Sequence, residues 1–317
     1  MTRLRILTAL SLVIFMAGLA SAQTKDKSAT SSRIAAATEK LANKQKFELR
    51  YQFDIGEVIR WNVEHVATTK AQIAGKDEKT SSRTQSVKLW KVKHVDNAGN
   101  ITLVHSVEST SLWQKIGDSE PIAYDSKVDK EAPEQFAAAQ EMIGKPLAEV
   151  TISPTGQIVR RDTEGKQINF GVGDLCTPLP DQPVPVGHQW FVPTVFDATD
   201  EDGKRLKLKA RVNYQLAKIT DGAAIISFRS EILTPIESDQ VKSQLLQKLN
   251  DGYVAIDLNK GRLVSKEVLW NEKVQEYAGA DSFLHYVGRM TEDIVVSNPI
   301  QPQPRISGAI GTKDSKE

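Results

Sequence analysis

Apolar and polar residues alternate over long stretches of this chain, and such alternation predicts β-strands with one buried face. The alternation is strict over residues 47–53, which read Phe-Glu-Leu-Arg-Tyr-Gln-Phe. It resumes after Gly56, where the apolar positions are Ile59, Trp61 and Val63. Both stretches are therefore expected to be strands with one face against a core.

Polar turns separate the predicted strands. The polar stretch Ala74–Ser82 is expected to turn the chain back, and the clearest hairpin turns are Asp96–Gly99 and Asp221-Gly222. Gly, Asn and Asp suit such turns because they tolerate positive φ angles. Since parallel strands would need crossover helices between them, the sequence predicts antiparallel meanders.

Two helices are expected, Glu134–Ile143 and Asp239–Leu249. Pro133 suits the opening turn of the first, and the Ser238 side chain can cap the second. Each helix has apolar residues at helical spacing on one face, namely Phe136, Ala139 and Ile143 in the first and Val241, Leu245 and Leu249 in the second. Each helix can therefore cover one sheet.

The order of the predicted elements occurs twice. Each pass has a strand opened by Gly and Trp, two long strands around a polar turn, a helix, and a short hairpin at Gly156 or Gly261. The predicted fold is mainly β (α+β), with two similar antiparallel curved sheets in tandem, each with one covering helix, as a pseudo-duplication. Chance similarity of two meanders is the alternative.

The beginning of the chain resembles an export signal. Arg3 and Arg5 precede the apolar stretch Ile6–Leu19, and Ala20–Ala22 has the A-x-A pattern of a cleavage site. The apolar stretch is short for a membrane span, so we expect a signal peptide that is removed on export. The mature protein would then be periplasmic or extracellular, and an uncleaved N-terminal anchor is the alternative.

Composition divides the remainder of the chain. Residues 23–46 are rich in Ser, Thr, Lys and Ala, and four prolines lie between Thr177 and Val186, where they predict an extended connector. The predicted parts are a signal peptide 1–22, a flexible linker 23–46, a first β-rich repeat 47–162, a Pro-rich connector 163–186, a second β-rich repeat 187–297 and a disordered tail 298–317.

The charge balance gives no support for nucleic-acid binding. The chain has 41 basic and 40 acidic residues, and removal of Arg3 and Arg5 leaves 39 against 40, a formal charge of −1. Nucleic-acid binding needs a clustered basic face. The stretches Lys88–Lys93 and Lys204–Lys209 alternate basic and apolar residues, so we expect their charges on a solvated outer sheet face. A site for an anionic surface is the alternative.

Sequence motifs of catalysis and metal binding are missing. The chain has no Gly-x-Ser-x-Gly, Gly-x-x-x-x-Gly-Lys, His-Glu-x-x-His or Cys-x-x-Cys motif. The acidic loop Asp197–Gly203 partly fits a calcium loop, but Ala198 and Lys209 stand where two essential ligands belong. The histidines of the chain are not spaced as metal ligands usually are. They are His65, His94, His105, His188 and His285. We therefore expect no enzyme, no cofactor and no metal site. An irregular weak calcium site in the acidic loop and a catalytic cluster of His, Asp and Ser brought together by the fold are the alternatives.

Cys176 is the chain's only cysteine, so it cannot form an internal disulfide. Unpaired cysteine is among the most buried residue types, and Cys176 is expected to be a small buried hydrophobic side chain. A nucleophile or an intermolecular bridge is the alternative.

Several of these features resemble a family of uncharacterised exported bacterial proteins that is known as a domain of unknown function. The resemblance covers most of the mature chain and includes the strand before Gly56, the segment Leu179–Trp190 and the hairpin at Gly156. It implies a duplicated β-rich envelope protein with no catalytic residues to carry over. Long curved strands with covering helices also resemble, by fold analogy, the half-barrels of periplasmic lipoprotein carriers, whose concavity holds acyl chains.

Large aromatic residues in the predicted strands are the best candidates for a ligand surface, although core packing is the usual role of such residues. One hypothesis is a non-catalytic binding protein that holds a hydrophobic or lipid-like ligand in an apolar groove. The residues expected to line this groove are Trp61, Val63, Trp90, Trp190, Phe228 and Trp270. The alternative is a structural or protein-interaction module of the envelope, with filled cores and strand edges that pair with a protein partner.

Overall fold

The computed structural model describes residues 45–163 and 176–295 of the 317-residue chain. The chain divides into two units, Met1–Lys46 and Phe47–Glu317, and the architecture below is that of the second. The predicted signal peptide and C-terminal tail lie outside the described residues, as do most of the predicted linker and half of the connector. In the part of the chain that is described, no helix is long and apolar enough to cross a membrane.

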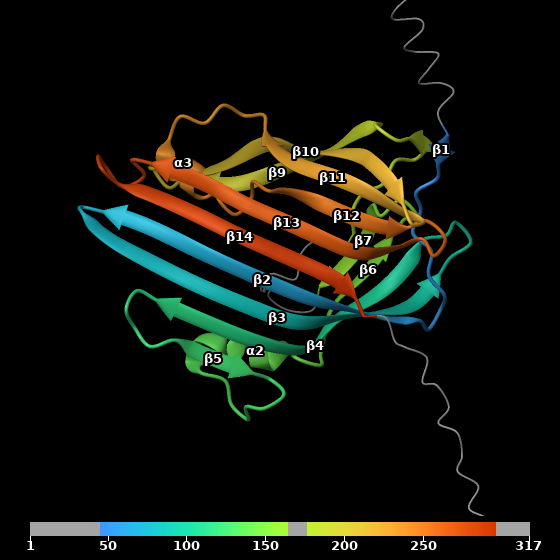
Figure 1. Ribbon diagram of the computed structural model, residues 1–317, viewed down its shortest axis with the longest axis horizontal. Helices are drawn as coiled ribbons and strands as arrows, with labels where there is room; N and C mark the ends of the chain where they lie inside the picture. The colour runs from blue at the N-terminus through green and yellow to red at the C-terminus, as the bar shows by residue number, and fades with distance from the viewer. Residues whose placement is uncertain (1–44, 164–175, 296–317) are drawn as a thin grey trace, which may run out of the picture. The chain divides into compact units, whose positions relative to one another are not determined.

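One twelve-stranded antiparallel sheet dominates the structure (Figure 1). Its strand order is β7-β6-β4-β3-β2-β14-β13-β12-β11-β10-β9, with β5 paired to β4, while β1 and β8 form a separate two-stranded sheet. The first half of the chain supplies β1 (Lys46–Phe47), β2 (Val58–Ile73), β3 (Lys76–Val95), β4 (Ile101–Ile116), β5 (Ile122–Asp125), β6 (Pro146–Ile152) and β7 (Ile158–Thr163). The second half supplies β8 (Val184–Pro185), β9 (Gln189–Thr199), β10 (Arg205–Thr220), β11 (Ala223–Ile232), β12 (Asp251–Asp257), β13 (Arg262–Gln275) and β14 (Phe283–Ile294).

The chain follows two meanders that share this sheet. The first runs through β2, β3, β4, β6 and β7, the second runs from β9 to β14, and β14 then pairs along β2. In that pairing Val63 lies opposite Glu292, and Trp61 lies opposite Ile294. The prediction of two sheets in tandem is therefore corrected to one continuous sheet, and the pseudo-duplication is not confirmed. The pairing of β2 with β14, which are distant in sequence, joins the two meanders that local sequence patterns predict as separate sheets.

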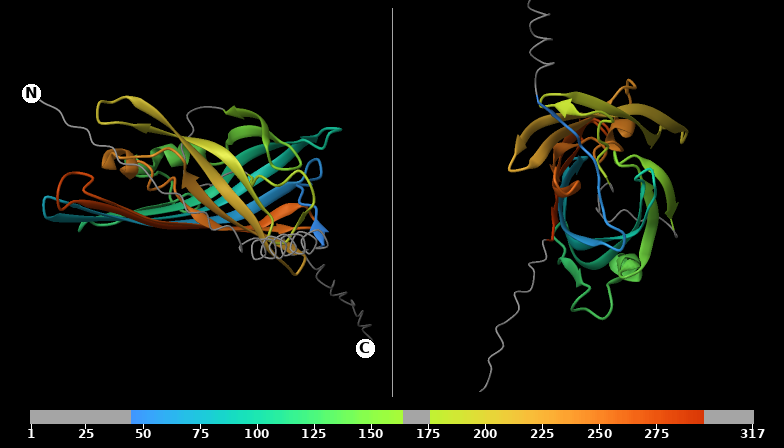
Figure 2. Two further views of the ribbon diagram at one scale, coloured as in Figure 1. Left: turned by 90° about the horizontal axis from the view of Figure 1, so that it is seen from above. Right: turned by 90° about the vertical axis from the view of Figure 1, so that its right-hand side faces the viewer.

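The sheet curls, so that the two meanders lie on opposite sides of a shared interior (Figure 2). Side chains of both meanders form one buried cluster on the concave face, which includes Trp61 and Trp90 from the first and Ile226 and Val254 from the second. Because burial of apolar surface is the main favourable contribution to folding, this shared cluster makes the two meanders one cooperative body.

Two segments with little regular structure, residues 49–53 and 176–186, contribute buried side chains to the interior, and we call them the end plug; the second contains the short strand β8. Leu49, Tyr51 and Phe53 are buried, as the alternation predicts, but they do not belong to a strand. The Tyr51 N–H donates to the Pro154 carbonyl (2.7 Å), and the Gln52 N–H donates to that of Gly261 (2.8 Å). The first segment thus bonds to the hairpin turns β6–β7 and β12–β13 instead of a neighbouring strand.

Helices occur at both predicted places but are shorter than expected. The first is η1 (Glu134–Phe136) followed by α2 (Ala137–Met142), and the second is α3 (Asp239–Ser243). The apolar face of the first packs on Leu112 and Tyr124, so it covers the sheet as predicted. Ser238 caps α3, since its Oγ accepts the Val241 N–H at 3.4 Å.

Two predicted turns have different outcomes. Asp221 and Gly222 form a two-residue hairpin turn with φ angles of 50° and 76°, as the sequence predicts. The stretch Ala74–Ser82 is not a polar turn, because only Ala74 and Gly75 turn the chain and β3 already begins at Lys76. Polar residues continue that hairpin because the outer part of β2–β3 is largely solvated on both faces.

Candidate functional site

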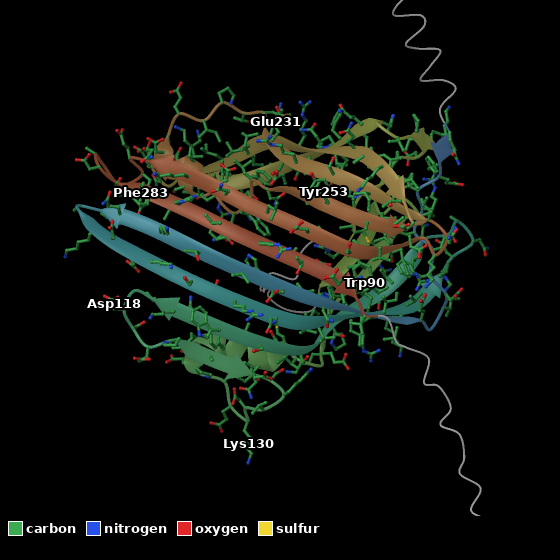
Figure 3. The ribbon with its side chains drawn as sticks, viewed as in Figure 1. Trp90, Asp118, Lys130, Glu231, Tyr253 and Phe283 are labelled. Carbon is green, nitrogen blue, oxygen red and sulfur yellow. The ribbon has the colours of Figure 1, made fainter. Side chains whose placement is uncertain are left out.

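Two lysines point into the concave interior, and the structure corrects the prediction for one of them. Lys88 has the same parity along β3 as Trp90 and Val92, so all three are buried, while Leu89 is on the other face. The predicted alternation does hold along β10, where Leu208 is buried and its lysine neighbours are exposed. Figure 3 shows Trp90 toward the plugged end of the sheet and Phe283 at the opposite end.

Lys88 forms a buried ion pair with Glu292 across the junction of the two meanders. The side chains are 2% and 1% exposed, and the Lys88 Nζ donates a hydrogen bond to Glu292 Oε2. The ammonium also lies 5.3 Å from the ring centre of Trp61 and 5.5 Å from that of Trp90. Burial lowers the pKa of Lys88, although Glu292 opposes that shift. This region is a filled polar core stabilised by a carboxylate and two aromatic faces.

Several polar atoms around this pair have no hydrogen-bond partner within the described part of the chain, and they are Glu292 Oε1, His105 Nε2 and the indole nitrogens of Trp61 and Trp90. Burial is the main cause that lowers the pKa of His105 to about 4, and the charges of Lys88 and Arg161 contribute to the same shift. The imidazole is therefore neutral near pH 7.

A cavity of about 530 Å³ lies on the concave face of the second meander. Its apolar wall includes Tyr214, Phe228, Val268, Trp270 and Met290, from four different strands. The segment after α3 and the second segment of the end plug also contribute to the lining, with Gln247, Lys248, Asn250, Cys176 and Thr177. Pockets of about 300–1,000 Å³ with mostly apolar walls and a few polar groups are typical of small-molecule sites. We call this space the inner cavity.

Lys266 contributes the most buried charge to the inner cavity. Its side chain is 7% exposed, and its ammonium lies 5.9 Å from the ring centre of Phe228. It sits directly opposite Glu292 in the β13–β14 pairing, so Glu292 has a lysine on each side. Sequence reasoning missed both lysines, although their parity with buried apolar neighbours marks them in each strand.

All six residues predicted to line a groove belong to the concave face. Trp61, Val63, Trp90 and Phe228 are buried core residues, and Trp190 and Trp270 pack against them. Phe228 and Trp270 line the inner cavity, whereas Trp61, Val63 and Trp90 are near the buried ion pair and do not line it. Trp190 instead donates its indole N–H to the Pro178 carbonyl (3.0 Å) in the end plug. The structure thus brings the set onto one face but divides it into a filled and a hollow part.

The other candidate residues have less distinctive surroundings. Cys176 is half-buried at the cavity, more exposed than predicted. In the acidic loop, Asp200 accepts backbone N–H groups of Asp202 and Lys204, which makes it a hairpin turn between β9 and β10. Over residues 45–163 and 176–295, no group of three or more His, Cys, Asp and Glu side chains is arranged to hold a metal ion.

Comparisons with known proteins find likeness in structure and none in sequence. No family model and no curated protein matches the chain. A solved structure described as "Lipid-protein interactions in lipovitellin" matches with a TM-score of 0.40 and 10% sequence identity. The match covers 80% of this chain and 26% of that one, so the present chain corresponds to about a quarter of the lipovitellin chain. At this level of likeness the comparison carries no functional argument, and the resemblance to a family stays a prediction.

Proposed function

We propose that this chain is an exported, non-catalytic binding protein of the cell envelope that holds a hydrophobic or lipid-like ligand in the inner cavity. The cavity itself is the observation that supports the proposal, because it is a concave space of about 530 Å³ whose lining combines aromatic and aliphatic side chains with polar groups. Small-molecule sites are of this size and combine both kinds of group. Export rests on the predicted signal peptide.

One part of the wall suits an apolar group. Phe228, Val268 and Met290 present only carbon and sulfur to the cavity, and Tyr214 and Trp270 add aromatic surface. An apolar chain transferred from water to such a wall gains about 25 cal/mol for each Å² that it buries. The lining also carries polar and charged groups, among them Ser230, Asn250 and Lys266, so an amphipathic ligand fits better than a wholly apolar one.

A neutral apolar fluorophore tests the proposal. N-phenyl-1-naphthylamine, whose fluorescence rises in apolar surroundings, is expected to bind the full chain and to be displaced by dodecanol. Thr194 points into the cavity from β9, so Thr194→Trp should fill part of the space and weaken binding at least tenfold. Val195 is adjacent and 53% exposed on the outer face, which makes Val195→Trp a matched control with unchanged binding. Equal binding by both variants, or no binding by the parent protein, would contradict the proposal.

The alternative role, an interaction module, has support at one edge of the sheet. Strand β9 ends the strand order and carries Phe191 and Val195, which are 59% and 53% exposed. An open strand edge can add a strand from a partner. Pro193 interrupts that edge because it has no N–H to donate, which weakens it as a pairing template. The cavity therefore supports ligand binding better than the edge supports strand addition.

A further inference from the structure

Lys266 is a buried cation whose charge no carboxylate in the described residues neutralises. Its side chain is more than nine-tenths buried and lines the inner cavity. Within residues 45–163 and 176–295 it makes a cation–π contact with Phe228, and no hydrogen bond or ion pair to its ammonium is found. Buried charges in proteins are normally paired, so an unpaired one at a cavity wall is a group that a ligand can complete.

The nearest carboxylate is already engaged. Glu292 is directly opposite Lys266 in the sheet, yet its Oε2 accepts the hydrogen bond from Lys88 and its Oε1 has no partner in the described chain. The three side chains carry two positive charges and one negative charge, so the cluster has a formal charge of +1. Lys88 is enclosed by Trp61 and Trp90, and the excess charge reaches the cavity through Lys266.

The remaining lining of the cavity has the same sign. Arg161 and Lys248 contribute two more cations, and the described lining residues include no Asp or Glu. Arg161 faces Val150 across β6–β7, which places it on the concave side of that edge. Charges of one sign around a partly apolar cavity concentrate the field in it and favour a ligand of the opposite sign.

We propose that the ligand of the inner cavity is an anionic amphiphile, whose single carboxylate or phosphate binds the Lys266 ammonium while its apolar chain packs on Phe228 and Trp270. This inference rests on the proposed function and specifies the class of ligand. Charge-assisted hydrogen bonds from an ammonium to such an oxygen are short and strong. A ligand anion would give Lys266 the partner that Glu292 already gives Lys88.

Competition against bound N-phenyl-1-naphthylamine measures the contribution of the ligand's head group separately from that of its apolar chain. We expect dodecanoate and dodecyl phosphate to displace the fluorophore from the full chain at concentrations at least tenfold lower than dodecanol. Dodecyltrimethylammonium should be weaker than dodecanol, because it brings a second cation to a cationic cavity. Inorganic phosphate should not displace the fluorophore, since it has no apolar chain.

Three substitutions at two positions of β13 test whether Lys266 causes the preference. Lys266→Met should remove the preference for dodecanoate over dodecanol, while Lys266→Arg should retain the preference. Lys273 is an exposed lysine on the opposite face of the same strand, so Lys273→Met is the matched control and should change neither affinity.

The outcomes distinguish this inference from the function on which it rests. Equal displacement by dodecanoate and dodecanol would overturn the anionic head group while keeping an apolar cavity. Loss of the preference in Lys273→Met as large as in Lys266→Met would overturn the role of Lys266, and displacement by inorganic phosphate as strong as by dodecyl phosphate would overturn the amphiphile. Failure of the fluorophore to bind would reject the proposed function itself.

Discussion

Lys88 and Lys266 lie on the concave face of one sheet, on either side of Glu292, and their surroundings differ. Lys88 is 2% exposed, bonded to Glu292 and enclosed by two indole rings. Lys266 is 7% exposed, contacts one phenyl ring and lines a cavity. A buried lysine on the concave face is thus part of a filled core at position 88 and part of a cavity wall at position 266.

The difference distinguishes a charge that is needed for the stability of the fold, that of Lys88, from a charge that is available to bind a ligand, that of Lys266. A buried ion pair tolerates no loss of one partner, since the remaining charge then has neither water nor a counterion. A buried cation at a cavity lacks that constraint, because it can be removed without exposing another charge. The lysine that matters most for stability should therefore matter least for binding, and the reverse should hold for its neighbour.

The largest expected effect comes from breaking the pair at Glu292. Glu292→Leu leaves the Lys88 ammonium unpaired, and removal of one partner of a buried pair costs about 3–5 kcal/mol in the free energy of unfolding. The double variant Lys88→Met/Glu292→Leu should be more stable than Glu292→Leu, because it leaves no isolated charge. Urea unfolding of the three proteins measures this order, and a loss below about 1 kcal/mol in Glu292→Leu would contradict the structural role of the pair.

Acid should lower the stability of the fold through protonation of His105, which lies in the filled region. Its pKa is lowered to about 4 in the folded protein, mainly by burial, from an ordinary value of 6.5. The unfolded chain therefore binds the proton first, and folding stability falls as pH decreases from about 6.5 to about 4, by about 3 kcal/mol for this group. His105→Leu should lose that part of the pH dependence. Parallel dependence of parent and variant in urea unfolding at pH 7 and pH 4 would refute the assignment.

The smallest effect on stability is expected at Lys266. Lys266→Met replaces an unpaired buried cation by an apolar side chain of similar length, so the free energy of unfolding should stay the same or rise by about 1 kcal/mol. Thermal or urea unfolding measures the change. A loss comparable to that of Glu292→Leu would show that Lys266 is part of the structural core, and the comparison between the two lysines would fail.

Local sequence patterns predict much of the strand content but not how the strands assemble. The buried positions Ile59, Trp61 and Val63 follow directly from alternation, and the Asp221-Gly222 turn follows from its residues. The pairing of β2 with β14 has no local signal, because strands distant in sequence meet through burial and not through spacing. That pairing turns two expected sheets into one.

The candidate site shows the same limit. Parity along β3 and β13 is enough to place Lys88 and Lys266 on a buried face, but treating basic residues as solvated hides both. The position of Glu292 between them follows from the register of three strands, which one residue of slip would reverse. Residues 49–53 show the complementary case, in which alternation predicts burial correctly and strand pairing wrongly.

The pairing of β2 with β14 also affects how the chain can fold during synthesis. Strand β2 is 16 residues long and is made early, and its hairpin with β3 can form at once, but its other edge waits for β14, more than 200 residues later. Until then a long open edge is available to other chains, and such edges promote aggregation. Pairing between strands that are far apart in the sequence also forms slowly. A ribosome-bound fragment that ends before β14 should accordingly depend on chaperones more than the finished chain does.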